Sequence, residues 1–287
     1  MNTFRRCGAI GNHELLPPHV THALAAMKTF WLHCQVARAL AIVSVLMWQQ
    51  TVFAQGVGAQ EHRAEPITSD SEAIAYKLTP SFYRTSNQPD AYDINVRANL
   101  ASHAAWVGFY RRANEFQQLR LGYENTISFP FGHFIPSVQY ATRGFLGGSL
   151  NAEIGERYFG LLGIGRTNLK DYFNLNFDPN DAVLIGAGTR ALPNTTLSAF
   201  QIRDDRLGTG QRVFHVVARI KPDGRTRWTF DVFYKEGRAA AGDEVKVHGT
   251  GISVTYDFDR YFVRAASDPH VNFTKEHMVR LAAGLRF

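Results

Sequence analysis

Apolar and polar residues alternate at every second position in several segments of the chain. Residues 227–235 contain the clearest case, with the apolar residues Trp228, Phe230, Val232 and Tyr234 between Arg227, Thr229, Asp231 and Lys235. Residues 93–100 and 251–258 repeat the pattern. A period of two places successive side chains on opposite faces of a β-strand. These segments therefore predict strands with one apolar and one polar face.

The last ten residues carry the same alternation up to a C-terminal aromatic residue. The apolar positions are Val279, Leu281, Ala283, Leu285 and Phe287. This ending resembles the terminal strand of Gram-negative outer-membrane β-barrel proteins, as a general class and not as one specific family. The resemblance implies that these residues form the terminal signal for the barrel-assembly machinery. It also implies a location in the outer membrane, with outer-membrane lipid and lipopolysaccharide as partners.

The strand pattern and the membrane together predict an all-β fold. After residue 54 the chain has no apolar stretch near the ~20 residues that a membrane helix needs. In lipid, only helices and closed barrels satisfy every backbone polar group. We therefore expect an antiparallel transmembrane β-barrel of 12 to 14 strands, with an even number. The predicted strands are 92–100, 106–110, 119–123, 134–140, 146–154, 158–164, 171–177, 182–189, 196–202, 214–220, 227–235, 251–258, 260–265 and 278–287.

The N-terminal part of the chain has the features of an export signal. Ala39 to Trp48 is an apolar run that is too short to span a bilayer. Residues 27–54 are typical of a signal peptide, which predicts cleavage between Ala54 and Gln55 and localisation in the outer membrane. Residues 1–26 lack an orderly positively charged start, so translation from Met27 is expected and the first 26 residues are interpreted as a misassigned extension.

Residues 55–91 do not continue the barrel pattern cleanly. Residues 55–70 are polar and rich in small residues, which predicts a periplasmic N-terminal segment. The alternation of Ile74, Tyr76 and Leu78 could add a strand or fold into the lumen, but Pro80 argues against a central strand. The barrel is therefore predicted over residues 92–287, with no second domain.

Composition excludes some classes of function. Cys7 and Cys34 both precede the predicted cleavage site, so the mature chain would have neither a disulfide nor thiolate chemistry. Removing residues 1–54 takes four of the 31 basic and one of the 25 acidic residues, which leaves a formal charge of +3. This value does not indicate a nucleic-acid partner. No pattern indicates a metal or another cofactor.

The connections between the predicted strands alternate in length. The longest are residues 126–132, 203–210, 236–244 and 266–277, and each follows an odd-numbered predicted strand. In outer-membrane barrels the longer loops are extracellular and the shorter turns are periplasmic. We therefore expect these four connections on the extracellular side.

The polar faces of the strands are where a function would reside. With the apolar faces in lipid, the lumen-facing candidates are Asp93, Arg97, Arg120, Glu124, Glu153, His215, Arg219, Arg227, Asp231, Lys235, Asp257, Arg280 and Arg286. One interpretation is a passive channel with a mild preference for anions. The other is a structural barrel whose charges pair across the lumen and occlude it. The sequence leaves both interpretations open.

Two further functions are alternatives. A hydrolase acting on lipid or lipopolysaccharide would use a serine and a histidine, such as Ser102 with His103 or Ser137 with His133. Adjacent residues of a strand point to opposite faces, so the first pair has poor geometry for proton transfer. Surface attachment through the loops is the second alternative. At the level of the fold, a water-soluble barrel with its aromatic residues inside is the rival.

Overall fold

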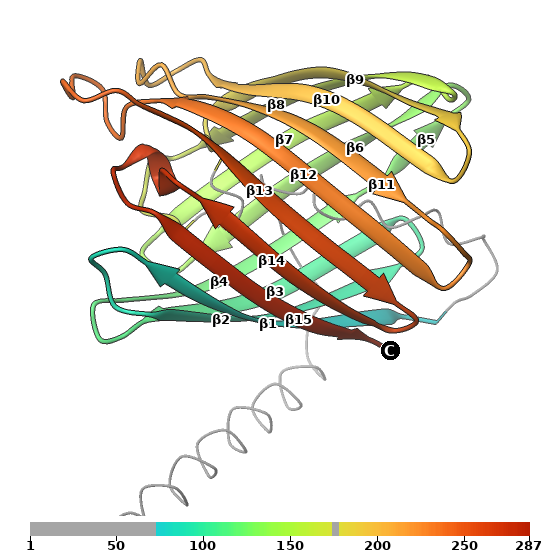
Figure 1. The fold of residues 1–287 in the computed structure, drawn as a ribbon, viewed down its shortest axis with the longest axis horizontal. Coiled ribbons are helices and arrows are strands. Elements are labelled where there is room, and N and C mark those ends of the chain that lie inside the picture. The colour runs from blue at the N-terminus through green and yellow to red at the C-terminus, as the bar shows by residue number, and fades with distance from the viewer. Residues whose placement is uncertain (1–72, 174–177) are drawn as a thin grey trace, which may run out of the picture. The chain divides into compact units, whose positions relative to one another are not determined.

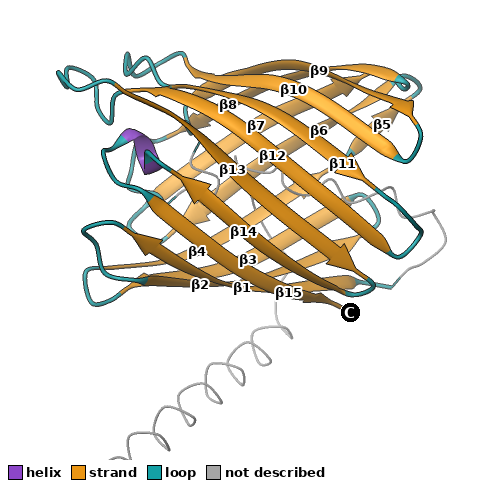
Figure 2. Cartoon of the chain, viewed as in Figure 1, coloured by secondary structure: helices purple, strands orange, loops and turns teal. Residues whose placement is uncertain are grey.

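The computed structural model describes residues 73–173 and 178–287 as a closed β-barrel (Figures 1 and 2). The elements are β1(Ala75–Thr85), β2(Ala91–Leu100), β3(His103–Arg112), β4(Phe116–Asn125), β5(Ile127–Phe129), β6(Gly132–Ala141), β7(Phe145–Ile154), β8(Tyr158–Thr167), β9(Ala182–Leu192), β10(Thr195–Asp204), β11(Arg212–Ile220), β12(Thr226–Gly237), β13(Val247–Phe258), β14(Tyr261–Asp268), the 3-10 turn η2(Val271–Phe273) and β15(Met278–Arg286). No helix in these ranges is long and apolar enough to cross a membrane.

Every strand pairs antiparallel with its neighbours in the chain, and the first strand pairs with the last. Lys77 lies opposite Arg286 and Thr85 lies opposite Met278, so β1 and β15 close the ring. Both β4 and β5 pair with β6, which makes them two segments of one barrel strand. The fifteen segments therefore form a closed antiparallel barrel of fourteen strands. This confirms the predicted fold class and the even strand number.

The barrel begins at Ala75, not at residue 92, so part of the predicted periplasmic segment is the first strand. Pro80 lies in the middle of β1 and is exposed. Proline has no backbone N–H to donate. In the pairing between β1 and β15 the matched residues jump from Leu78 to Ser81, which leaves Pro80 out of that ladder. The prediction was wrong here because the ladder tolerates one gap at an outward-facing position.

A second correction concerns the segment before β9. The predicted strand 171–177 is absent at residues 171–173, which are irregular, and residues 174–177 lie outside the described part of the chain. One strand is thus gained at the start and one is lost in the middle. Because a strand is gained at the start, connection 126–132 follows an even-numbered strand and lies at the end opposite to the one predicted. β5 extends to Phe129, so only residues 130–131 form the turn.

The four longest connections, 168–181, 205–211, 238–246 and 269–277, lie at one end of the barrel together with 86–90, 113–115 and 142–144 (Figure 1). The turns at the other end are 101–102, 130–131, 155–157, 193–194, 221–225 and 259–260, and none is longer than five residues. Among the tight turns, residues 221–225 are fixed by Asp223, which accepts hydrogen bonds from the backbone N–H groups of Arg225 and Thr226 at 2.8 and 2.7 Å. These two donors hold the pKa of the Asp223 carboxyl below its usual range.

The outer surface of the barrel is apolar. Large apolar side chains are exposed at mid-strand positions, among them Leu121, Leu162, Ile185, Val216, Val232, Ile252 and Leu281. Aromatic side chains are exposed near both strand ends: Tyr92, Phe109, Tyr140, Phe214 and Tyr234 toward the longer loops, and Phe131, Tyr158, Tyr261 and Phe287 toward the tight turns. An apolar band between two aromatic girdles is the surface of a membrane-spanning barrel.

Glycines allow inward-facing rings to lie against the wall. Trp106, Phe159, Phe233 and Phe262 each lie opposite a glycine of the next strand, namely Gly122, Gly188, Gly251 and Gly284 respectively. A Cβ atom at Gly122 would come within 1.9 Å of the Trp106 ring, and one at Gly284 within 1.9 Å of the Phe262 ring. Glycine at these positions thus provides the room that the rings occupy.

The outward position of Val232 gives a first prediction. Val232→Arg should destabilise the folded barrel by about 2 to 4 kcal/mol, because the charge would face hydrocarbon near mid-strand. His248→Arg, an exposed position near the loop end of β13, is the matched control and should cost no more than about 1 kcal/mol. Denaturant titration of the protein in lipid vesicles measures both. Equal costs at the two positions would contradict the assigned membrane level.

Ring packing on glycine gives a second prediction. Gly122→Ala should destabilise the barrel by about 1 to 3 kcal/mol, because the new methyl group displaces Trp106. Gly160→Ala is the control, since its Cβ would have no neighbour nearer than 3.9 Å. The same denaturant titration compares the two. A Gly122→Ala barrel as stable as the Gly160→Ala barrel would show that the Trp106 ring does not pack there.

Candidate functional site

The inner face of the barrel carries its charged side chains. All thirteen lumen-facing candidates lie on the buried side of the wall, where Arg120, Lys235 and Asp93 are almost completely buried. The others are buried or half-buried: Arg97, Glu124, Glu153, His215, Arg219, Arg227, Asp231, Asp257, Arg280 and Arg286. The same alternation that exposes apolar residues on the outside therefore places these groups inside.

Ion pairs join inward charges of β2 to inward charges of β4, across the intervening strand β3. Arg120 of β4 donates a hydrogen bond to Asp93 of β2, and both side chains are buried. Arg97 donates to Glu124, and its guanidinium also lies over the Trp106 ring at 5.3 Å from the centroid. Buried charges need such partners because a low-dielectric environment penalises an isolated ion.

Further pairs follow around the ring. Lys235 of β12 donates to Asp268 of β14 at 2.6 Å. Asp257 of β13 accepts from Arg227 of β12 at 3.1 Å and also from Arg286 of β15. The carboxylate of Asp257 thus ties together strands on both sides of its own.

Several inner charges fall outside the predicted set. Arg190 pairs with Glu153 at 2.7 Å, and Arg206 pairs with the buried Asp181 at 2.7 Å. Lys77 and Arg264 are also buried on the inner face. Lys77 lies in β1, which was not predicted, Arg190 lies just beyond the predicted strand 182–189, and Asp181 and Arg206 lie in loops. Arg264 lies within the predicted strand 260–265, where its parity with the inward Phe262 would have placed it inside.

The connection between β8 and β9 contacts the inner face of the barrel through its described residues, 168–173 and 178–181. The Gln118 side chain of β4 donates to the Asp171 carbonyl at 2.8 Å and accepts from the Phe173 backbone N–H at 2.9 Å. The Phe173 ring stacks on Tyr110 with centroids 3.6 Å apart. Tyr172 stacks on Phe145 at 4.2 Å, and burial raises the pKa of Tyr172 to about 12, which keeps its hydroxyl neutral. This part of the loop is therefore fixed to one wall.

The same loop contacts a distant wall a few residues later. Asp178 accepts from the His215 imidazole of β11 at 3.1 Å, and the other ring nitrogen of His215 contacts Asp231 at 3.0 Å. His215 also stacks on Phe200 with centroids 4.7 Å apart. Since β4 and β11 are six strands apart in a ring of fourteen, the loop touches nearly opposite walls. Phe173 and Asp178 are five residues apart, so their Cα atoms lie at most ~18 Å from each other.

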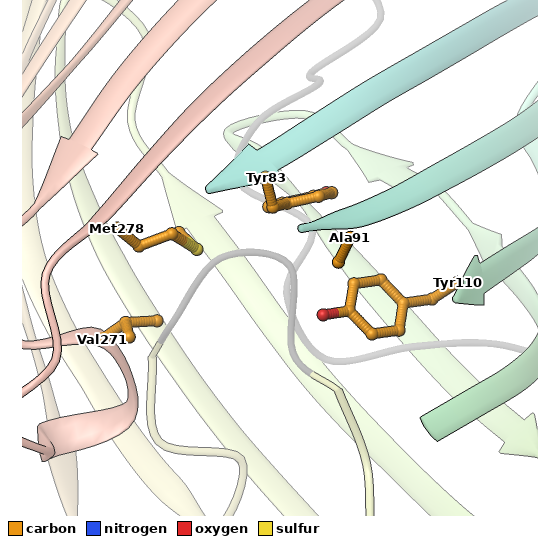
Figure 3. Close-up of a cluster of buried hydrophobic side chains, with 5 residues drawn as sticks. All are labelled: Tyr83, Ala91, Tyr110, Val271 and Met278. Carbon is orange, nitrogen blue, oxygen red and sulfur yellow. The ribbon is translucent and has the colours of Figure 1, made fainter. Parts of the chain in front are cut away.

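Apolar packing narrows the end with the longer loops as well. Tyr83, Ala91, Tyr110, Val271 and Met278 form a buried cluster (Figure 3), against which Phe116 and Phe173 pack. Val271 belongs to η2, so the last loop also turns inward. Phe273 of the same turn packs against Val213, Phe233 and Val247. Two loops thus line the mouth of the barrel from within.

The structure gives the hydrolase candidates no catalytic geometry. Ser137 and His133 lie four residues apart on one strand, a separation of ~13 Å along β6. The Ser137 hydroxyl instead contacts Ser149 across the sheet. His103 is exposed and contacts the Tyr123 hydroxyl at 2.5 Å, while Ser102 lies in the turn before it. Within residues 73–173 and 178–287 no cluster of histidine, cysteine or acidic side chains has the geometry of a metal site.

The two terminal predictions have different outcomes. Val279, Leu281, Ala283, Leu285 and Phe287 lie on the outward face of β15 or directly after it, as the pattern predicts. Their use as an assembly signal stays a prediction. The cleavage site at Ala54 and Gln55 and the boundaries at 26 and 54 lie outside the described residues.

Comparison with known proteins gives similarity in structure only. No protein-family model and no curated protein sequence matches the chain. Similar solved structures include the Acinetobacter baumannii outer membrane protein Omp33, at 10% identity and a TM-score of 0.49 over 75% of this chain and 98% of that one. Salmonella typhi OmpF in complex with daunomycin matches at 10% identity and a TM-score of 0.43, over 75% of this chain and 97% of OmpF. The NanC porin matches at 6% identity and 0.41, over 72% and 98%. The chain is thus similar to outer-membrane barrels and porins at a level that transfers no residue roles.

Proposed function

We propose that the protein is a passive outer-membrane channel with a narrow, charged lumen that favours anions. The observation that carries this proposal is the inverted barrel itself, in which apolar residues cover the outside and charged residues line the inside. A structural barrel alone would be served by an apolar interior, since burying ions is costly. A charged interior suits the passage of water and solutes.

The balance of inner charges supports the preference for anions. Among the thirteen predicted residues, Arg97, Arg120, Arg219, Arg227, Lys235, Arg280 and Arg286 are cationic, whereas Asp93, Glu124, Glu153, Asp231 and Asp257 are anionic. The additional inner residues Lys77, Arg190, Arg206 and Arg264 are cationic, and Asp178, Asp181 and Asp268 are anionic. The excess of positive charge lowers the electrostatic barrier for negative solutes.

The ion pairs and the inward loop favour the second candidate, an occluded structural barrel. Paired charges such as Arg120 with Asp93 fill space, and the loop reaches nearly opposite walls. Conductance separates the two candidates. We place the channel first because, among residues 73–173 and 178–287, the inward cations named above outnumber the inward acidic residues.

Single-channel recording in a planar bilayer tests this proposal. The folded mature chain should give steady currents with an anion-to-cation permeability ratio above one. Lys77→Gln should lower that ratio, because it removes a buried inner charge, while Arg84→Gln on the outward face of the same strand should leave it unchanged. Absence of current from a barrel that migrates as folded on a gel would favour the occluded barrel.

Assembly in the outer membrane gives a separate prediction. Phe287 pairs with Tyr76 through two backbone hydrogen bonds of 2.7 and 3.0 Å, and the two rings stack at 5.6 Å. If Phe287 belongs to the assembly signal, Phe287→Ala should reduce the folded barrel recovered from cells several-fold. Tyr76→Ala is the control, since it removes the same ring contact and keeps the terminal residue.

Comparing the two variants in cells and in detergent separates a role of Phe287 in assembly from a role in packing. Both purified chains should refold in detergent to similar extents, because each has lost the same stacking pair. Equal losses in cells for Tyr76→Ala and Phe287→Ala would indicate a packing role at the barrel seam and would contradict the signal.

A further inference from the structure

A hollow of about 200 Å³ lies where β3 and β4 meet the longer loops, and we call it the rim hollow. The connection between β3 and β4 forms part of its lining, and the turn between β6 and β7 contributes one more side chain. Its lining includes Arg111, Asn114, Glu115, Phe116, Gln117 and Arg143. None of these six residues belongs to the inward charges described above.

Two guanidinium groups of the rim hollow are held by uncharged partners. Arg111 donates from Nε to the Ala113 carbonyl at 3.0 Å and from Nη2 to Oδ1 of Asn114 at 3.1 Å. The Arg143 guanidinium lies over the Phe116 ring, 4.5 Å from its centroid. The acidic residue of the lining, Glu115, pairs with Arg112 at 3.4 Å. The rim hollow is therefore positively charged.

The contacts of Arg111 also determine what it can bind. A guanidinium has five N–H donors in a rigid plane, and Arg111 uses two of them within its own turn, so three remain for a ligand. Such a fork matches the oxygen atoms of a phosphate or a carboxylate. Because the two hydrogen bonds hold the group before binding, little conformational entropy is lost when an anion arrives.

The rim hollow lies at the edge of the lipid-facing surface. Arg111 follows the exposed Phe109 by two residues on the outward face of β3, a distance of ~7 Å along the strand. Tyr92 of β2 lies opposite Arg111, and Leu119 of β4 lies opposite Phe109. Exposed aromatic side chains mark the level of the lipid head groups. The two guanidiniums therefore lie at the head-group level, next to a surface that contacts acyl chains.

This position favours a lipid phosphate over a free one. Exposed arginines bind a dissolved anion weakly, because water and salt screen the attraction. A lipid already held on the apolar surface presents its head group at a high effective concentration. The amides of Asn114 and Gln117 and the carboxylate of Glu115 can in addition form hydrogen bonds with hydroxyl groups, which a sugar supplies.

We propose that the rim hollow binds the phosphate of a phosphorylated sugar head group on a lipid of the outer leaflet. Lipopolysaccharide, a partner expected from the sequence, belongs to this class. Arg111 and Arg143 would contact the phosphate while the acyl chains lie along Phe109 and Leu119. The site rests on the location of the barrel in the outer membrane and is independent of whether the lumen conducts.

Native mass spectrometry of the full mature chain, released from detergent with added lipid A, tests the site. The double variant Arg111→Gln/Arg143→Gln should weaken lipid A binding at least about tenfold, because it removes charge-assisted hydrogen bonds to the phosphate. The control Arg84→Gln/Arg166→Gln removes two outward charges at the same end of the barrel, which pair with Asp90 at 3.2 Å and Asp205 at 2.7 Å. It should change the affinity less than about twofold. Gel migration of unheated samples shows that each variant is folded.

Two further probes identify the source of the phosphate. Dephosphorylated lipid A should bind the unaltered chain as weakly as lipid A binds the Arg111→Gln/Arg143→Gln variant. Inorganic phosphate, measured by equilibrium dialysis, should not bind at concentrations that saturate the chain with lipid A. Inorganic phosphate that binds as tightly as lipid A would overturn the lipid as the ligand. Equal binding of lipid A to both double variants would overturn the site, whatever current the barrel carries.

Discussion

Within hydrocarbon no water can satisfy an unpaired backbone N–H or C=O, and this constraint makes the pairing between β1 and β15 the contact on which the structure depends. That pairing joins Lys77 to Arg286 and Thr85 to Met278, and it removes the last free edges of the sheet. The gap at Thr79 and Pro80 is tolerated because pairing with β15 resumes at Ser81, and on the other side β1 is paired with β2 from Ala75 to Tyr83 without interruption. Closure also fixes which face of every strand points inward. The residue at which a strand begins therefore determines which of its side chains face the lumen and which face the lipid.

Closure of the barrel directs many charged side chains into its interior. Ion pairs with charges on nearby strands satisfy them. Charges directed into a narrow interior need partners, and pairs such as Arg120 with Asp93 and Lys235 with Asp268 supply them between nearby strands. Asp178, in the connection between β8 and β9, forms another such pair with His215.

Strong alternation made much of the barrel predictable. The strands at residues 227–235 and 278–287 could be predicted because their side chains alternate between the lipid and a polar interior. The first strand escaped prediction because Pro80 interrupts its pattern, and Lys77 was missed with it. Residues 171–177 were predicted as a short strand. In the structure Tyr172 and Phe173 instead pack inside the barrel, against Phe145 and Tyr110 respectively. The partner of His215 could not be predicted, since Asp178 comes from a loop whose inward path depends on contacts with β4.

The inverted arrangement of faces is the central claim, and site-directed spin labelling along β12 tests it most directly. Both native cysteines precede the predicted mature start, so single cysteines can be placed at residues 229 to 234 of the mature chain without competing thiols. In lipid vesicles, labels at 230, 232 and 234 should be accessible to oxygen, which partitions into the bilayer, and labels at 229, 231 and 233 should favour a water-soluble nickel chelate. An accessibility period of two residues in this phase is the predicted result. The opposite phase, or no period at all, would contradict a barrel with lipid outside and a polar lumen within.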